Sequence, residues 1–251
     1  MEVPVYIFES GERTRGLSVF CFEKLGHKDV KLVSEGKTFK DKYILFAEAA
    51  LESESDYFIR SDSDCLAFEG VTSLLNKAIK EGYDWLTGVY FDYVMNRFRG
   101  GTPQILSRAV LEILVENNDI MPDSNKPETD FSIAIKDKVA MGDVNIFTNL
   151  HEFEQFPSKV CNSFLNRMKR GHNRLYNNEH LGSLPAHYRK SIEVALKELR
   201  SQKEKDNMHY QDFKFLDDGF VEISVDDYEK VYSHYSSIFD SLNRSYTEMN
   251  P

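Results

Sequence analysis

Two carboxylates separated by one small residue, Asp62-Ser63-Asp64, form the sharpest chemical signal in the chain. They follow Asp56–Arg60 (DYFIR), an apolar segment that reads as a strand, and ligands bind outside the carboxyl ends of strands in open α/β sheets. Two unpaired acids there would repel each other unless a cation joins them. Magnesium and manganese suit such oxygen ligands and also bind substrate phosphates. The pattern predicts a divalent-metal site; the alternative is a solvated turn that caps the helix expected from Glu69.

Alternating strands and helices are expected to position these acids over the first 150 residues. Apolar spacing predicts strands over Val3–Phe8, Val30–Val33, Asp56–Arg60 and Trp85–Phe91, and helices over Thr14–Leu25, Lys40–Glu54, Glu69–Glu81 and Ser107–Asn117. This order is typical of βαβ units and of a mostly parallel sheet flanked by helices on both faces. The predicted class is therefore α/β and Rossmann-like. Trp85, the sole tryptophan, is expected in the core.

The remainder of the chain reads differently. Tyr188–Lys205 is an amphipathic helix candidate, Gly219–Val225 reads as a strand, and Asp226–Tyr246 carries tyrosines at helical spacing. We expect one domain over residues 1–156 and a mainly helical extension over 157–251. The tyrosine-rich last helix either covers the sheet or offers a dimer face.

Composition narrows the classes of protein. The 251 residues are 41% hydrophobic and 29% charged, which fits a folded chain with a sizeable core. The net charge of −10 argues against indiscriminate coating of nucleic acid. Cys21, Cys65 and Cys161 are odd in number and far apart, so neither a disulfide framework nor a zinc knuckle is expected. No stretch reads as a signal peptide or membrane span, which favours a cytoplasmic protein of bacterial or viral origin.

Three further motifs follow the acidic pair in chain order. They are Arg99–Arg108 (RGGTPQILSR), Pro127–Ala134 (PETDFSIA) and Asn149–Glu152 (NLHE), the last of which comes after the apolar strand candidate Val144–Phe147. Together with DYFIRSDSDCLAF they resemble the DxD region, the glycine-pair loop, the acidic helix start and the metal-binding histidine of GT-A class glycosyltransferases. The resemblance covers about residues 1–155.

This resemblance implies a GT-A-like fold and transfer of a sugar from a nucleoside-diphosphate sugar to a hydroxyl group. It implies a metal held by Asp62, Asp64 and His151, with manganese or magnesium as the cofactor. Asp64 would be the direct ligand, and Asp62 would contact the ribose or a metal-bound water. A neutral imidazole suits manganese better than magnesium, whereas a lone histidine is more often structural.

The resemblance also implies a general base near the start of the acidic helix. Asp130 is favoured because Phe131 then matches the apolar residue that follows the acid, and Glu128 stays open because the chain reads Glu-Thr-Asp. Such a base predicts inversion, while retaining members need none, and helix-dipole complementation is the plain alternative. The expected donor-binding residues are Phe8, Glu9, Ser10, Arg13, Arg60, Asp62, Gly100 and Gly101.

The acceptor is less defined. The segment Lys159–Arg174 contains five Lys or Arg and no acid, which suits a phosphate backbone. A glycan and a hydroxymethylated DNA base, as in phage DNA-modifying enzymes, are both open. The acceptor-binding candidates are Arg97, Arg99, Lys169, Arg170 and Arg174. The competing functions are a nucleotidyltransferase and a non-enzymatic metal-binding module. The sugar, the nucleotide and the oligomeric state are not indicated.

Overall fold

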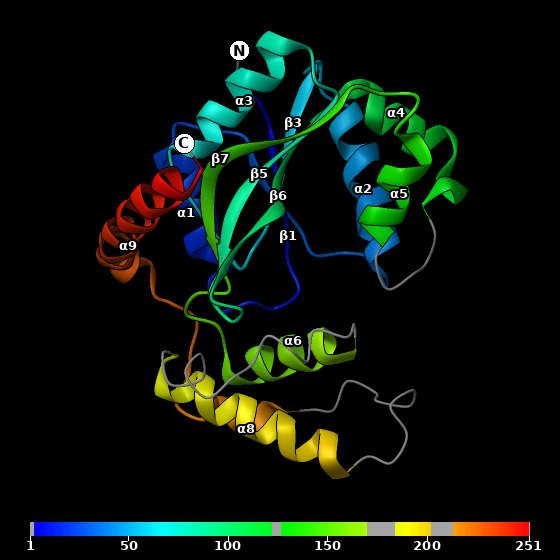
Figure 1. Cartoon of the computed structure of the whole chain (residues 1–251). Helices are drawn as coiled ribbons and strands as arrows, with labels where there is room; N and C mark the ends of the chain where they lie inside the picture. Colours follow the sequence, from blue (N-terminus) through cyan, green and yellow to red (C-terminus); the bar gives the residue numbers. More distant parts are fainter. Residues whose placement is uncertain (1–2, 122–126, 170–183, 202–212, 251) are drawn as a thin grey trace.

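The computed structural model describes residues 3–121, 127–169, 184–201 and 213–250 (Figure 1). Its strands are β1 (Val5–Phe8), β2 (Val30–Val33), β3 (Tyr57–Asp62), β4 (Cys65–Ala67), β5 (Trp85–Asp92), β6 (Arg97–Ser107) and β7 (Met141–His151). Its helices are α1 (Arg15–Lys24), α2 (Phe39–Leu51), α3 (Gly70–Glu81), α4 (Arg108–Glu116), α5 (Pro127–Ile135), α6 (Pro157–Lys169), α8 (Ala186–Ser201) and α9 (Tyr228–Met249).

The strands form one sheet in the order β2-β1-β3-β6-β5-β7-β4. The ladders β1–β2, β1–β3 and β5–β7 are parallel, whereas β6 pairs antiparallel with β3 and β5, and β4 pairs antiparallel with β7. Hence β1, β2, β3, β5 and β7 point the same way, and β4 and β6 run against them. The predicted α/β, Rossmann-like class with a mostly parallel sheet is confirmed.

Alternation along the strands builds a core on each face of the sheet. Val5 and Ile7 of β1 lie in one core cluster, and Tyr6 and Phe8 lie in the other. Helices α1, α3 and α9 cover the first face, and α2, α4 and α5 cover the second (Figure 1). Each fully buried large apolar side chain stabilises the fold by about 1.5–3 kcal/mol. Trp85 is buried in the second cluster, as expected.

Local signals explain where several helices begin and end. Helix α2 starts at a capping box in which Thr38 and Asp41 satisfy each other's backbone N–H groups. Helix α3 ends at Gly82, whose φ of 70° suits a residue without Cβ. Ser107, expected within a helix, instead ends β6 and precedes α4, and its hydroxyl donates to Asp84 and does not cap the helix.

Helix α9 covers the sheet, which agrees with one of the two readings of its tyrosine spacing. Its rings stack on aromatic residues of the first core: Phe239 lies 4.3 Å from Phe68 and 4.4 Å from Phe147, between ring centroids. Helices α6 and α8 instead form a separate apolar cluster that includes Val94. The segment after residue 157 therefore contributes both to the sheet's core and to a cluster of its own.

Two sequence expectations are wrong in the structure. The glycine pair Gly100-Gly101 lies within strand β6 and not in a loop; at this point Gly88 of β5 faces three residues of β6, so the pair sits at a bulge. The range 219–225 forms no strand, because it has no partner strand and its Ile223 N–H bonds only to the Arg13 carbonyl. Alternating apolar residues there leave Val221 exposed.

Candidate metal centre

Three strands end in residues that could bind a cation. Asp62, Asp92 and His151 are the last residues of β3, β5 and β7. Because these strands point the same way, their final residues meet at one edge of the sheet. Cys65 begins β4 and is the direct cross-strand partner of His151. The sheet therefore gathers these side chains from three separate stretches of sequence.

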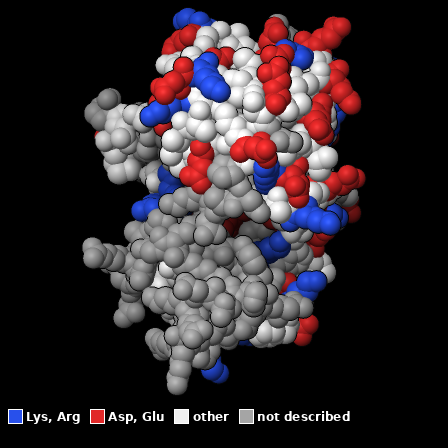
Figure 2. Space-filling view, turned by 90° about the vertical axis from the view of Figure 1, so that its right-hand side faces the viewer, with Lys and Arg blue, Asp and Glu red and all other residues white. Residues whose placement is uncertain are grey.

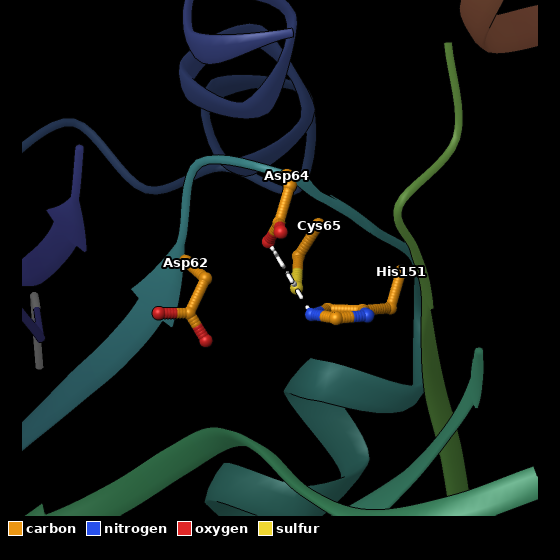
Figure 3. Close-up of side chains that lie close together, drawn as sticks. All are labelled: Asp62, Asp64, Cys65 and His151. Atoms are coloured by element: carbon orange, nitrogen blue, oxygen red, sulfur yellow. Dashed lines mark hydrogen bonds and ion pairs between the residues drawn. The ribbon is translucent and has the colours of Figure 1, made fainter. Parts of the chain in front are cut away.

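Asp62, Asp64, Cys65 and His151 offer ligand atoms that all lie within 4.8 Å of one another. The Nε2 atom of His151 is 3.5 Å from Oδ1 of Asp64, and Sγ of Cys65 is 3.7 Å from the same oxygen. In Figure 3 the side chains of Asp64, Cys65 and His151 point toward one another, and Asp62 lies beside them at the end of its strand. Two carboxylates, an imidazole and a thiol form a donor set that could hold a divalent cation.

The electrostatic surroundings of Asp64 favour a positive charge next to its carboxylate. The pKa of Asp64 is raised to about 7: burial is the largest cause, the neighbouring carboxylates of Asp62, Glu152 and Glu12 add to it, and His151 acts in the opposite direction. The pKa of His151 is raised as well, because the attraction of Asp64, Glu152 and Asp92 outweighs burial. The Asp64–His151 pair therefore retains a proton near neutral pH, in a place where a metal ion would replace it.

Asp62 differs from Asp64 because an arginine side chain binds its carboxylate. Arg60 is 1% exposed, and its Nη1 and Nη2 atoms lie 3.1 and 2.7 Å from the two Asp62 carboxylate oxygens. The guanidinium also sits 4.4 Å from the centroid of Phe8 and contacts the rings of Phe39 and Tyr43. Arg60 thus neutralises the first acid of the pair and holds it in one orientation.

Of the two acids in α5, Glu128 is the one joined to this arginine. Its Oε1 atom lies 3.0 Å from Arg60 Nη1 and accepts hydrogen bonds from the Tyr43 hydroxyl at 2.6 Å and from Gln104 at 3.2 Å. Asp130 is two residues further on, which places it about 200° around the helix. Glu128 shares the inward face with the buried Phe131, so helical geometry turns the two carboxylates to different sides.

A second acidic group lies on the other side of His151. Asp92 and Glu152 join His151 as possible ligands within 4.8 Å, and Nδ1 of His151 is 3.8 Å from Oε2 of Glu152. Here the charges are already matched: Arg167 of α6 bonds Glu152 and reaches Asp92 at 2.9 Å, while Arg99 lies 3.5 Å from Asp92. Asp92 is completely buried.

Sequence reasoning missed this second group and Cys65. Asp92 directly follows the predicted strand Trp85–Phe91, so the rule that singled out Asp62 could have found it. Cys65 adjoins Asp64 in the sequence. Arg167 lies in the basic segment that had suggested a phosphate backbone, and only the docking of α6 shows its contact with two buried acids.

The expected donor-binding loop between β1 and α1 contacts Ser63, the residue between the two acids. The Ser63 hydroxyl donates a hydrogen bond to Glu12 at 2.6 Å. The Lys42 side chain donates to the Ser10 hydroxyl, and the Lys159 side chain donates to the Ser10 carbonyl. Glu9 accepts from the Gly11 N–H at 2.7 Å. Arg13 instead bonds Glu154 at 2.6 Å and the Val221 carbonyl at 2.7 Å. Ser63 thus links the loop to the Asp62-Ser63-Asp64 motif, while Lys42 of α2 and Lys159 of α6 hold the loop from two helices.

The remaining acceptor-binding candidates are spread over the fold. Arg97 and Arg99 both lie on β6, and the Nε of Arg97 is buried without a hydrogen-bond partner among the described residues. Lys169 ends α6, whereas Arg170 and Arg174 lie outside the described residues. Figure 2 shows acidic and basic side chains interspersed over the described part of one face. Among the described residues, no helix has the length and apolar character needed to cross a bilayer.

No protein-family model matches the chain, and no curated protein matches its sequence. Similar solved structures include A197 from STIV (15% identity, 58% of this chain and 82% of that one, TM-score 0.47). A glycosyltransferase involved in glycosylation of the major capsid of PBCV-1 has 9% identity, coverages of 59% and 92%, and a TM-score of 0.37. A candidate nucleotide-diphospho-sugar transferase from Desulfovibrio desulfuricans G20 has 11% identity, coverages of 80% and 96%, and a TM-score of 0.36. Similarity at this level concerns architecture, so the chemistry has to be inferred from the site residues.

Proposed function

We propose that the chain is a metal-dependent glycosyltransferase that moves a sugar from a nucleoside-diphosphate sugar to a hydroxyl acceptor. One observation carries the proposal: Asp64 has no lysine or arginine partner in the described parts of the chain, although its ligand atom lies within 4.8 Å of those of Asp62 and His151. Such an acid-rich, cation-poor place at the carboxyl edge of an α/β sheet suits a metal and a diphosphate.

Asp64 and His151 would hold the cation in this proposal. When bound, a divalent metal supplies Lewis-acid stabilisation of the charge that develops on the departing nucleoside diphosphate. The Glu152 carboxylate lies 3.8 Å from Nδ1 of His151, and its negative charge would favour a proton on that nitrogen, which would leave Nε2 free to bind a metal. Asp62 is held by Arg60 and would orient the donor's ribose. Most of the rate gain would come from positioning and fixed charges.

We assign the general base to Glu128 in preference to Asp130. All of the described contacts of Glu128 involve Oε1, so Oε2 can accept a proton from an acceptor hydroxyl. The side chain is 33% exposed, which lets an acceptor approach it. Arg60 joins Glu128 to Asp62, so the base and the donor site would be held at a fixed distance. If Glu128 takes the proton while the acceptor oxygen attacks the anomeric carbon directly, the configuration at that carbon is inverted.

Calorimetry with nucleoside diphosphates tests the proposal. The full chain would be titrated with UDP, GDP, ADP and dTDP in the presence of Mn²⁺, Mg²⁺ or Zn²⁺ in turn, and without metal. Binding of at least one nucleotide that requires metal, lost in Asp64→Asn and kept in Asp137→Asn, would support it. Asp137 is a suitable control because it is an exposed acid.

Other outcomes would separate the competing functions. Metal binding without affinity for any nucleotide would favour the metal-binding module, and pyrophosphate release from a nucleoside triphosphate would favour the nucleotidyltransferase. For the acceptor, sugar transfer would be compared on glycans and on hydroxymethylated DNA. Transfer to such DNA that falls with moderate salt, with donor hydrolysis unchanged, would assign the DNA acceptor. If no sugar were transferred to DNA at any salt concentration, a glycan would be the favoured acceptor.

A further inference from the structure

The metal centre contains a sulfur atom that oxygen-preferring ions do not need. Cys65 follows Asp64 in the chain, is completely buried, and belongs to the same group of ligand atoms within 4.8 Å. We propose that Cys65 is a direct ligand, so that the centre binds Zn²⁺ or Co²⁺ through Asp64, Cys65 and His151 in preference to Mg²⁺ or Mn²⁺. The inference rests on the proposed function only in placing a cation at Asp64.

The position of the thiol is fixed by the sheet. Cys65 and His151 are directly opposite each other in the antiparallel β4–β7 ladder, so their side chains stand on the same face. Apart from Asp64, the described contact of Sγ is with the Thr102 hydroxyl at 4.0 Å. Figure 3 shows the sulfur between Asp64 and the imidazole. A ligand presented by a strand needs little reorganisation to bind a metal.

Asp62 is the member of the group that this ligand set omits. Arg60 already engages both of its carboxylate oxygens, whereas no arginine or lysine in the described chain pairs with Asp64. That leaves one oxygen, one nitrogen and one sulfur ligand. Zinc sites with three protein ligands keep a fourth position for water or substrate, and a donor phosphate could take it here. Magnesium prefers six oxygens, and thiolates favour softer ions.

Binding would convert the thiol to a thiolate. The Cys65 S–H bond breaks, the sulfur electron pair forms the metal bond, and the proton leaves to solvent, as for other cysteine ligands. No change of oxidation state is involved. One proton should therefore be released per bound Zn²⁺ from this group, in addition to any proton that leaves the Asp64–His151 pair.

Cobalt provides the test, because thiolate bound to Co²⁺ gives an intense near-ultraviolet charge-transfer absorption that oxygen and nitrogen ligands do not give. The full chain is titrated with Co²⁺, and competition with Zn²⁺ and Mn²⁺ gives relative affinities. We expect the band in the parent and in Cys161→Ser, whose thiol lies in the α6–α8 cluster. In Cys65→Ser the band should vanish and Zn²⁺ affinity should fall at least about tenfold, with Mn²⁺ affinity within about twofold of the parent.

Cobalt binding by the parent without the band would overturn the inference and leave the proposed function intact, because metal would still bind through oxygen and nitrogen. Retention of the band in Cys65→Ser would overturn it as well. If Cys65→Ser fails to fold, retention of the band in Cys161→Ser and in a matching Cys21→Ser variant assigns it to Cys65, because these are the other two cysteines. Failure of every nucleotide to bind, with the band present, would contradict the proposed function and support the thiol ligand.

Discussion

Two acidic groups share His151, one at each ring nitrogen, and they differ in what balances their charge. Asp92 and Glu152 are matched by Arg167, with Arg99 close to Asp92. Among the described residues, the one basic group that pairs with Asp64, on the Nε2 side, is the His151 imidazole. Removing a carboxylate from water costs several kcal/mol unless a partner compensates. The protein supplies arginines for Asp92 and Glu152, whereas no arginine or lysine of the described residues pairs with Asp64.

The same contrast separates the two acids of the Asp62-Ser63-Asp64 motif. Arg60 binds both oxygens of Asp62, so this residue is already satisfied before any cation arrives. Asp64 follows by two residues and turns toward Cys65 and His151. The motif is therefore two different carboxylates, one that is part of the fold's own charge network and one that is available to a metal.

Replacing the available carboxylate should have the largest effect. Asp64→Asn is expected to lower metal affinity more than about 100-fold and to abolish sugar transfer, because a ligand is lost. Stability without metal should not fall, since Asn removes an ionisation that burial disfavours. Calorimetry with each metal and thermal unfolding check both parts. If Asp64→Asn bound metal as tightly as the parent, the contrast between the two groups would have no functional meaning.

The next largest effect is expected at α5. Glu128→Gln should lower kcat by about 10²–10⁴ and leave metal affinity unchanged, because the amide keeps the Oε1 contacts but cannot accept the proton. Asp130→Asn is the matched control and should stay near the parent rate. Single-turnover kinetics with saturating donor measure the step directly. If Asp130→Asn lowered kcat more than Glu128→Gln did, Asp130 would be the general base, as the sequence motif alone suggested.

A smaller effect, on stability, should appear at the matched group. Arg167→Met is expected to lower the free energy of unfolding by about 3–5 kcal/mol, because Asp92 and Glu152 would stay buried without their cation. Arg244→Met, on the exposed side of α9, should change it by less than about 0.5 kcal/mol. Urea unfolding of the metal-free protein compares them. Equal costs for the two variants would show that Arg167 is not needed to balance the acids.

Features that depend on local sequence could be predicted, whereas features that depend on contacts between distant residues could not. Asp62, Asp64 and His151 could be expected at one edge because each follows an apolar strand, and strand ends converge in α/β sheets. Strand β6 was missed because Gly100 and Gly101 are typical of a loop, and only pairing with β3 and β5 makes the segment a strand.

The charge balance could not be predicted for the same reason. Arg167 lies 75 residues after Asp92 in the chain, so nothing in the local sequence marks them as partners. The contact of Arg60 with Glu128 likewise needs α5 to pack against the sheet. Spacing predicted that Asp62 and Asp64 lie near His151 but did not reveal Asp92 and Glu152, and tertiary packing decides which of these acids are neutralised.

The smallest effect should come from Glu154, another acid that already has an arginine partner. Burial alone would raise its pKa, but hydrogen bonds from Tyr235 and Arg13 outweigh burial and lower it. A lowered pKa means that the contribution of Glu154 is present above its unfolded value of about 4.3 and is lost as pH falls through the folded value. Glu154→Gln should cost roughly 1 kcal/mol at pH 7, and the difference from the parent should shrink below about pH 4. Urea unfolding across this range, with the exposed Glu248→Gln as control, measures it; a difference that grew on acidification would mean that Arg13 and Tyr235 do not stabilise the charged form.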